Sequence, residues 1–168
     1  MSERLLRQMA VLLGIAAQAV GMSGYASYQR GTPHREEISF VFLTSYKVQI
    51  TKQVNYGETP LGKRVDVHFE GELTGDRLSG TMQGIDYVTI RPDGITEISP
   101  RASIQTRDGA FISVQISGYE FPDGTIKDTF VRFLTGDKRY DWLNNKVVFG
   151  EGRVLSGTEF AINYYYLP

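Results

Sequence analysis

The residue types best suited to chemistry are carboxylates, guanidinium groups and phenols in the central and C-terminal parts of the chain. Asp86 stands in Gly84-Ile85-Asp86-Tyr87, where a glycine lets the backbone approach a ligand closely. A buried carboxylate here would act as a general base with a raised pKa. Alternatively, Asp86 caps a turn or pairs with Arg91 or Arg101.

Two arginines follow Asp86 in the same region. Arg91 and Arg101 are suited to orienting a carboxylate or enolate oxygen, because a guanidinium group makes bidentate contacts. The alternative is a structural ion pair with Glu97 or Asp86. We predict that Asp86 and Arg101 are catalytic and that Arg91 and Glu97 contact the ligand.

Aromatic residues with a polar atom provide the next candidates. Tyr140 is predicted to be catalytic through its phenol, and Trp142, Tyr164 and Tyr166 are predicted to line a ligand pocket. Each combines an apolar body with one hydrogen-bonding group. The alternative for all four is packing in the core or at its rim.

The histidines and the absence of cysteine narrow the chemistry further. His68 has Asp66 and Glu70 as neighbours on one strand face, so it forms either a proton relay that contacts a ligand or part of a solvated surface. With only His68 and His34, and no cysteine, no metal site is expected. No phosphate-binding loop, dinucleotide fingerprint or Gly-x-Ser-x-Gly motif is found. The predicted chemistry is therefore cofactor-free.

Composition also bears on the partners. The 168 residues include 18 Lys and Arg against 19 Asp and Glu, a net charge of −1. Nucleic-acid binding is not expected, because phosphate contacts require a clustered basic excess. The expected partner is a small hydrophobic ligand, and a homodimer is considered possible.

Short strands must position these residues. From residue 38 onward, segments of strand character alternate with turns such as Arg91-Pro92-Asp93-Gly94, in which Asp-Gly supplies the positive φ of a tight hairpin. The pattern predicts an all-β domain of eight to ten strands over 38–168, a closed antiparallel barrel or, alternatively, a sandwich. Alternation alone does not say which face lines a cavity. The expected strands are 38–43, 46–50, 63–73, 78–83, 87–91, 95–99, 102–106, 110–117, 130–134, 146–149 and 159–166.

Four segments resemble the bacterial barrel family catalogued as domain of unknown function 3237. They are 57–64, 84–101, 106–110 and 133–144, and Tyr140-Asp141-Trp142-Leu143-Asn144 is the most specific. The resemblance implies a compact antiparallel barrel, often oligomeric, whose open end holds a small molecule; it implies no reaction. Around Asp86 this chain departs from the family pattern, with Gln83 in place of a glycine and Tyr87 in place of a tryptophan.

Residues 1–37 are predicted to form a helix and a polar linker. Apolar residues recur at helical spacing between Leu5 and Val20, over too short a length to span a membrane. The segment is a packing helix, a lid over a cavity or a secretory signal. A cytoplasmic location is expected, or a secreted or periplasmic one if residues 1–26 are a cleaved signal.

Two functions fit these observations. One is a cofactor-independent isomerase or cyclase that acts on a hydrophobic, polyketide-like intermediate in the barrel. The other is a non-catalytic binding or carrier barrel.

Overall fold

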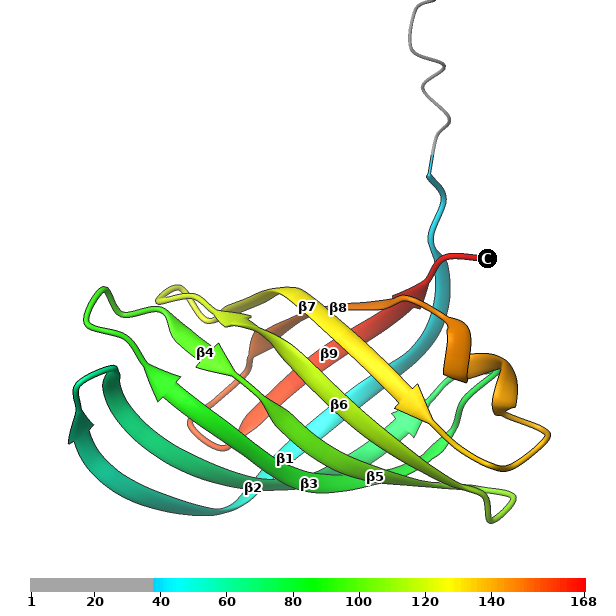
Figure 1. The fold of residues 1–168 in the computed structure, drawn as a ribbon, viewed down its shortest axis with the longest axis horizontal. Coiled ribbons are helices and arrows are strands. Elements are labelled where there is room, and N and C mark those ends of the chain that lie inside the picture. The colour runs from blue at the N-terminus through cyan, green and yellow to red at the C-terminus, as the bar shows by residue number, and fades with distance from the viewer. Residues whose placement is uncertain (1–37) are drawn as a thin grey trace, which may run out of the picture. The chain divides into compact units, whose positions relative to one another are not determined.

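Nine β-strands and one short 3₁₀ helix make up most of the chain that the computed structural model describes, residues 38–168 (Figure 1). The helix predicted near the N-terminus lies outside the described residues, which contain no α-helix. The elements are β1 (Val41–Thr59), β2 (Gly62–Thr74), β3 (Gly80–Ile90), β4 (Thr96–Ile98), β5 (Pro100–Thr106), β6 (Phe111–Glu120), β7 (Thr125–Leu134), η1 (Asp141–Asn145), β8 (Val148–Val154) and β9 (Glu159–Tyr166).

The strands close into an antiparallel barrel. β1 pairs with β2 on one side and with β9 on the other, so the sheet has no free edge. β4 and β5 both lie between β3 and β6, and together they occupy the place of one strand interrupted at Ser99. The barrel therefore has eight strand positions. The predicted closed barrel is confirmed, and the sandwich alternative is wrong.

Several strands extend beyond the ranges that the sequence pattern predicts, and β1 and β3 also run through expected interruptions. Residues 84–86, expected between two strands, belong to the continuous strand β3, because β2 and β5 pair with it on either side. The segments 38–43 and 46–50, expected as one strand or as two in succession, belong to the single strand β1 from Val41 onward, in which residues 44–45 pair with β9. Aligned partners on both sides thus keep glycine-containing and polar segments extended.

The inward side chains form one hydrophobic core, and η1 closes one end of it. Leu143 in η1 is fully buried. Trp142 packs edge-on against Tyr166, with 5.4 Å between ring centres. The guanidinium group of Arg77 lies 4.0 Å from the centre of the Trp142 ring and donates a hydrogen bond to the Tyr166 hydroxyl. This end of the barrel is therefore filled by side chains.

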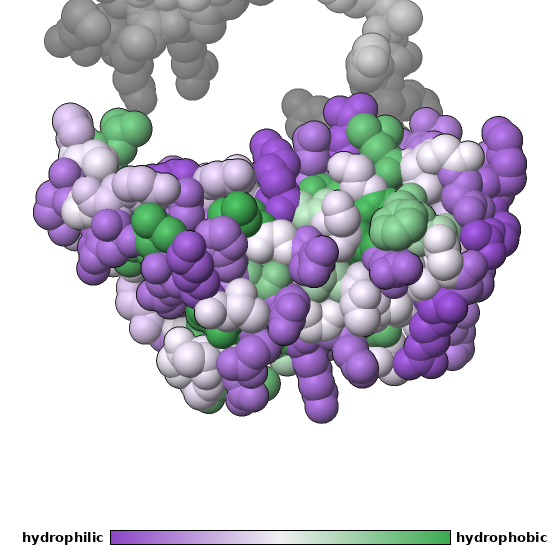
Figure 2. All heavy atoms as spheres, turned by 90° about the horizontal axis from the view of Figure 1, so that it is seen from below, coloured by the Kyte–Doolittle hydropathy of each residue, from purple (hydrophilic) through white to green (hydrophobic). Residues whose placement is uncertain are grey.

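The outer surface is mainly polar on the face seen in Figure 2, where hydrophobic side chains are scattered among hydrophilic ones. This matches the alternation of buried and exposed positions along strands such as β6. Within residues 38–168, no helix has the length and apolar character that crossing a membrane requires.

Candidate functional site

A cavity of about 380 Å³ occupies the barrel interior toward the end opposite η1. Its wall is largely aliphatic and aromatic, with Val88, Ile116 and Phe160 among the lining residues. The ionisable and phenolic side chains in this wall include Asp86 of β3, Glu120 of β6 and Tyr164 of β9. An apolar enclosure with a few convergent polar groups is the usual form of a small-molecule site.

Asp86 is the first of these polar groups. It lies on β3 opposite Val67 of β2 and Pro100 of β5, and its side chain lines the cavity. The strand interruption at Ser99 frees a backbone N–H, which donates a 2.7 Å hydrogen bond to Asp86 Oδ1. Burial raises the pKa of Asp86 to about 7, although the Ser99 N–H opposes this effect; the charge of Glu120 adds to it.

Glu120 is the second carboxyl group in the cavity. It is the last residue of β6 and pairs with Thr96 of β4, at the open end of the barrel. Burial raises its pKa as well. Among the described residues neither Asp86 nor Glu120 forms an ion pair; the nearby Arg64 is held by Asp66 at 3.0 Å. Within residues 38–168 the two carboxyl groups of the cavity therefore form no ion pair, although Lys63 of β2 also lines the wall.

Tyr164 is the third polar group, and it lies deeper. Its side chain is 2% exposed, and its hydroxyl has no hydrogen-bond partner among the described residues. By contrast, the hydroxyl of the neighbouring Tyr46 donates a 2.9 Å hydrogen bond to the Met82 carbonyl. Burial raises the pKa of Tyr164, and the charge of Asp86 raises it further. Asp86 is thus electrostatically coupled to both Glu120 and Tyr164.

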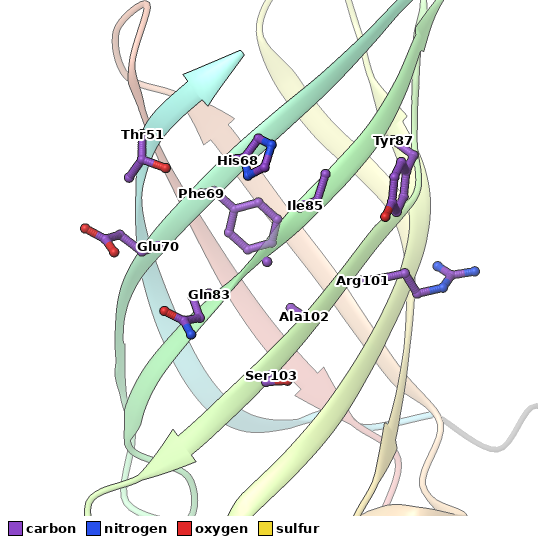
Figure 3. Close-up of a pocket in the computed structure, with 11 residues that line it drawn as sticks. Thr51, His68, Phe69, Glu70, Gln83, Ile85, Tyr87, Arg101, Ala102 and Ser103 are labelled. Carbon is purple, nitrogen blue, oxygen red and sulfur yellow. The ribbon is translucent and has the colours of Figure 1, made fainter. Parts of the chain in front are cut away.

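A second, larger depression of about 490 Å³ lies on the outer wall over β2, β3 and β5 (Figure 3). His68, Gln83, Tyr87 and Arg101 line it, and Arg101 donates a hydrogen bond to the Pro100 carbonyl at 3.0 Å. We favour the interior cavity despite its smaller volume, because a hydrogen bond or charge is worth more away from water.

The outer groove also separates predicted partners. Asp86 and Tyr87 are adjacent on β3 and face opposite sides of the sheet, so Arg101 and His68 stand outside while Asp86 faces in. Gln83 and Tyr87, where the chain departs from the family pattern, both line the outer groove. Asp86 and Arg101, both predicted to be catalytic, are therefore on opposite faces of the sheet.

Three other predicted residues lie at the closed end. Tyr140 donates a 3.0 Å hydrogen bond to Asp108, which Arg139 also contacts at 2.9 Å. Burial and this hydrogen bond raise the pKa of Tyr140. Trp142 and Tyr166 pack together around Arg77. These residues fasten η1 to the barrel and are not among those that line the interior cavity.

The remaining pair, Arg91 and Glu97, lies in the exposed β3–β4 hairpin. Arg91 contacts Asp93 at 2.6 Å and Glu97 at 3.6 Å. This is the structural ion pair weighed as the alternative to a ligand role. Of the nine predicted site residues, only Asp86 and Tyr164 share the cavity.

Sequence reasoning missed Glu120, although a signal was present. Ile112, Val114 and Ile116 form the buried face of β6, and the same alternation continues through Gly118 to Glu120. A charged residue at the end of an inward-facing series is the signal. No group of three or more His, Cys, Asp or Glu side chains arranged to hold a metal ion is found within residues 38–168.

Comparison with known proteins agrees with this fold. Residues 38–167 match the family described as "Protein of unknown function (DUF3237)". The chain belongs to this family. The resemblance stated from the motifs is thereby confirmed, and the match covers nearly the whole barrel of this DUF3237 member.

Two curated relatives of this DUF3237 chain are UPF0311 proteins. A UPF0311 protein of Bradyrhizobium diazoefficiens is 30% identical over 122 residues, covering 60% of this chain and 80% of the relative. A UPF0311 protein of Clostridium acetobutylicum is 26% identical over 132 residues, covering 67% and 84%.

Solved structures share the barrel. A β-barrel-like protein from Acinetobacter baumannii superposes with a TM-score of 0.71 at 23% identity, covering 79% of this chain and 98% of that one. A structure described as an enzyme from Penicillium herquei gives a TM-score of 0.62 at 24% identity, covering 77% and 94%. At these identities the likeness shows the fold.

Proposed function

We propose that this protein is a cofactor-independent isomerase or cyclase that binds a hydrophobic small molecule in the barrel cavity. The observation that carries the proposal is the convergence of Asp86, Glu120 and the Tyr164 hydroxyl on one apolar cavity. A carboxyl group with a pKa of about 7 exchanges protons readily near neutral pH. Proton transfer of this kind needs no cofactor.

Two further points support this function. The Penicillium herquei protein with the same barrel is described as an enzyme. The cavity volume of about 380 Å³ also falls in the range typical of small-molecule sites. A polyketide-like intermediate remains our suggestion for the substrate, since such molecules combine apolar rings with carbonyl groups.

A non-catalytic carrier is the second candidate, because the wall is mainly apolar and would bind such a molecule without reaction. Binding and turnover must therefore be measured separately. 2-Naphthol serves as the binding probe, because it joins an apolar bicyclic body to a single hydroxyl group. 2-Tetralone serves as the turnover probe, because enzyme-catalysed exchange of its α-protons in D₂O is visible by proton NMR.

Calorimetric titration with 2-naphthol tests the location of binding. We expect binding to the wild type and at least about tenfold weaker binding to Val88→Phe, which fills the cavity. The matched Val147→Phe, at a position 40% exposed, should bind like the wild type. Absence of binding to the wild type, or equal binding to both variants, would contradict the proposed site.

Exchange of 2-tetralone protons tests catalysis. We expect the wild type to accelerate exchange. At pH 6, Asp86→Asn should accelerate it at least about tenfold less than the wild type does, a conservative figure for the loss of a general acid–base group. The exposed Asp76→Asn should retain it. Binding of 2-naphthol without any exchange by the wild type would favour the carrier.

A further inference from the structure

Asp86, Glu120 and Tyr164, three of the polar residues that line the cavity, lie at different depths. Glu120 ends β6 at the open rim, and Asp86 lies four residues inside the end of β3. Tyr164 is five residues into β9 from the same end. The order from rim to floor is therefore Glu120, Asp86, Tyr164.

Depth gives the two carboxyl groups different access to water. Glu120 is half-buried at the mouth, so a proton that it gains can be returned to solvent. Asp86 is also partly exposed, but it lies farther from the rim. Apart from its hydrogen bond from Ser99, it is influenced by the charge of Glu120 on β6, and its own charge acts on Tyr164 on β9. On β2, Arg64 favours the charged form of Asp86 and Asp66 disfavours it, and Lys63 of the same strand also lines the cavity. The rim carboxyl is thus better placed to be ionised, and the inner one to stay protonated.

The Tyr164 hydroxyl points independently to a ligand. A buried hydroxyl without a partner lowers stability, whereas the hydroxyl of Tyr46 beside it donates a hydrogen bond to the Met82 carbonyl. A ligand oxygen that accepted a hydrogen bond from Tyr164 would remove this cost. The floor of the cavity thus has one hydrogen-bond donor available, and a protonated Asp86 would provide a second.

Resting on the proposed function, we propose that the substrate is a neutral, enolisable carbonyl compound on which Glu120 and Asp86 have different roles. The Glu120 carboxylate takes the proton from the carbon next to the carbonyl group. Protonated Asp86 and Tyr164 donate hydrogen bonds to the carbonyl oxygen. Glu120, which the sequence reasoning missed, becomes a catalytic residue.

The step balances without a further reactant. The C–H bond breaks and its proton forms an O–H bond on Glu120, while the electron pair forms a C=C bond and moves the carbonyl π electrons onto oxygen. The two donors stabilise this oxygen, as oxyanion-binding groups do. Return of the proton to another carbon gives an isomer, and return to the same carbon after exchange with D₂O gives a deuterated substrate.

The charges of the cavity also select the ligand class. An anionic carboxylate ligand would meet the two carboxyl groups Asp86 and Glu120 against the single ammonium group of Lys63, so repulsion by the ionised carboxyl groups outweighs the attraction. A hydrophobic ammonium ion would instead favour ionisation of both carboxyl groups, so it would bind more tightly as the pH rises. A neutral carbonyl compound requires the protonated form of Asp86 and has the opposite pH dependence.

The test compares Glu120→Gln and Asp86→Asn in 2-tetralone exchange from pH 5 to 9. We expect Glu120→Gln to lose at least about 100-fold in exchange rate, with 2-naphthol binding changed by less than about threefold. Asp86→Asn keeps a side-chain donor, and we expect it to retain slow exchange. The wild-type exchange constant, corrected for the reaction without protein, should fall above about pH 7, and Asp86→Asn should abolish that fall.

The outcomes separate this inference from the proposed function. If the wild type exchanges protons but Glu120→Gln exchanges equally fast, the role of Glu120 is overturned while the proposed function stands. A rate that rises through pH 7 and disappears in Asp86→Asn would make Asp86 the base and also overturn the inference. If 2-naphthol binds only outside the cavity, the proposed function itself fails. Naphthalene-2-methylammonium that binds more tightly than 2-naphthol at pH 8 would overturn the neutral-carbonyl class.

Discussion

A carboxyl group inside an apolar barrel makes the stability of the protein depend on pH. The pKa of Asp86 in the folded chain is about 7, against an ordinary value of 3.8. Between these two values the folded protein binds more protons than the unfolded chain. The free energy of unfolding contributed by Asp86 therefore decreases as the pH rises from about 4 to 7.

We predict that the stability of Asp86→Asn relative to the wild type increases from acidic to alkaline pH. One pH unit corresponds to about 1.4 kcal/mol, so the full difference is equivalent to ~4 kcal/mol. Asparagine keeps an acceptor for the Ser99 N–H. Urea unfolding at pH 4.5 and pH 8 measures the free energy of unfolding of both proteins. The value for the variant minus that for the wild type should be larger at pH 8 than at pH 4.5 by at least about 1 kcal/mol.

The control for this experiment is Asp76→Asn, which alters an exposed aspartate. Its difference from the wild type should be the same at both pH values. If Asp86→Asn also showed no change between pH 4.5 and 8, the carboxyl group would not be in the enclosed environment described for it.

At the scale of elements, β8 determines where Tyr164 lies. Gly150 of β8 is paired with Tyr164 of β9. A Cβ atom at this glycine would lie 2.9 Å from the Tyr164 ring and 3.3 Å from the Thr129 side chain. The absence of a side chain at Gly150 thus allows the ring to take its place in the barrel.

We predict that Gly150→Ala destabilises the barrel by about 1–3 kcal/mol, because the added methyl group overpacks the core. Weaker binding of 2-naphthol should accompany this loss, since the Tyr164 ring must move. Gly136→Ala is the matched control, because a Cβ there meets no atom within 4 Å. Equal unfolding midpoints for the two variants would contradict the tight contact.

Much of the strand pattern could be predicted from the sequence, and the reasons for the failures are physical. Alternation located β2 and β6, and Asp-Gly located the hairpin before Ile95, where Gly94 has a φ of 84°. The continuity of β3 through Gly84 depends on pairing with both neighbouring strands, which no local pattern contains. Long-range pairing overrode the local turn signal.

The site was predicted less well, for a related reason. Period-two alternation separates two faces of a strand but does not identify the inner one. Asp86 and Tyr164 share the interior, whereas Arg101, close to Asp86 in sequence, lies on the outer wall because its strand turns it outward. Nearness along the chain was therefore a poor guide to nearness in the site.

At the scale of the molecule, the barrel is closed entirely by strands of residues 38–168. Every strand has at least two neighbours within this range, as the cyan-to-red circuit of Figure 1 shows. We propose that this range is an independent folding domain. Its stability should not depend on residues outside it.

We predict that a chain of residues 38–168 unfolds cooperatively in urea with a midpoint close to that of the full chain. The comparison variant is a chain of residues 50–168, which lacks the part of β1 that pairs with β9. That chain should fail to fold, because β9 then has an open edge. Aggregation or loss of cooperative unfolding in 38–168 would contradict the prediction.

The pairing of β1 with β9 also has a consequence during protein synthesis. Val41 pairs with Tyr166, so β1 can complete its pairing only after β9 has been synthesised. Contacts of such sequence separation slow folding, and meanwhile β1 of the nascent chain presents unpaired backbone and apolar side chains such as Leu43 and Val48. A chain whose synthesis stops before β9 would thus keep these surfaces exposed and would depend on chaperones to prevent its aggregation.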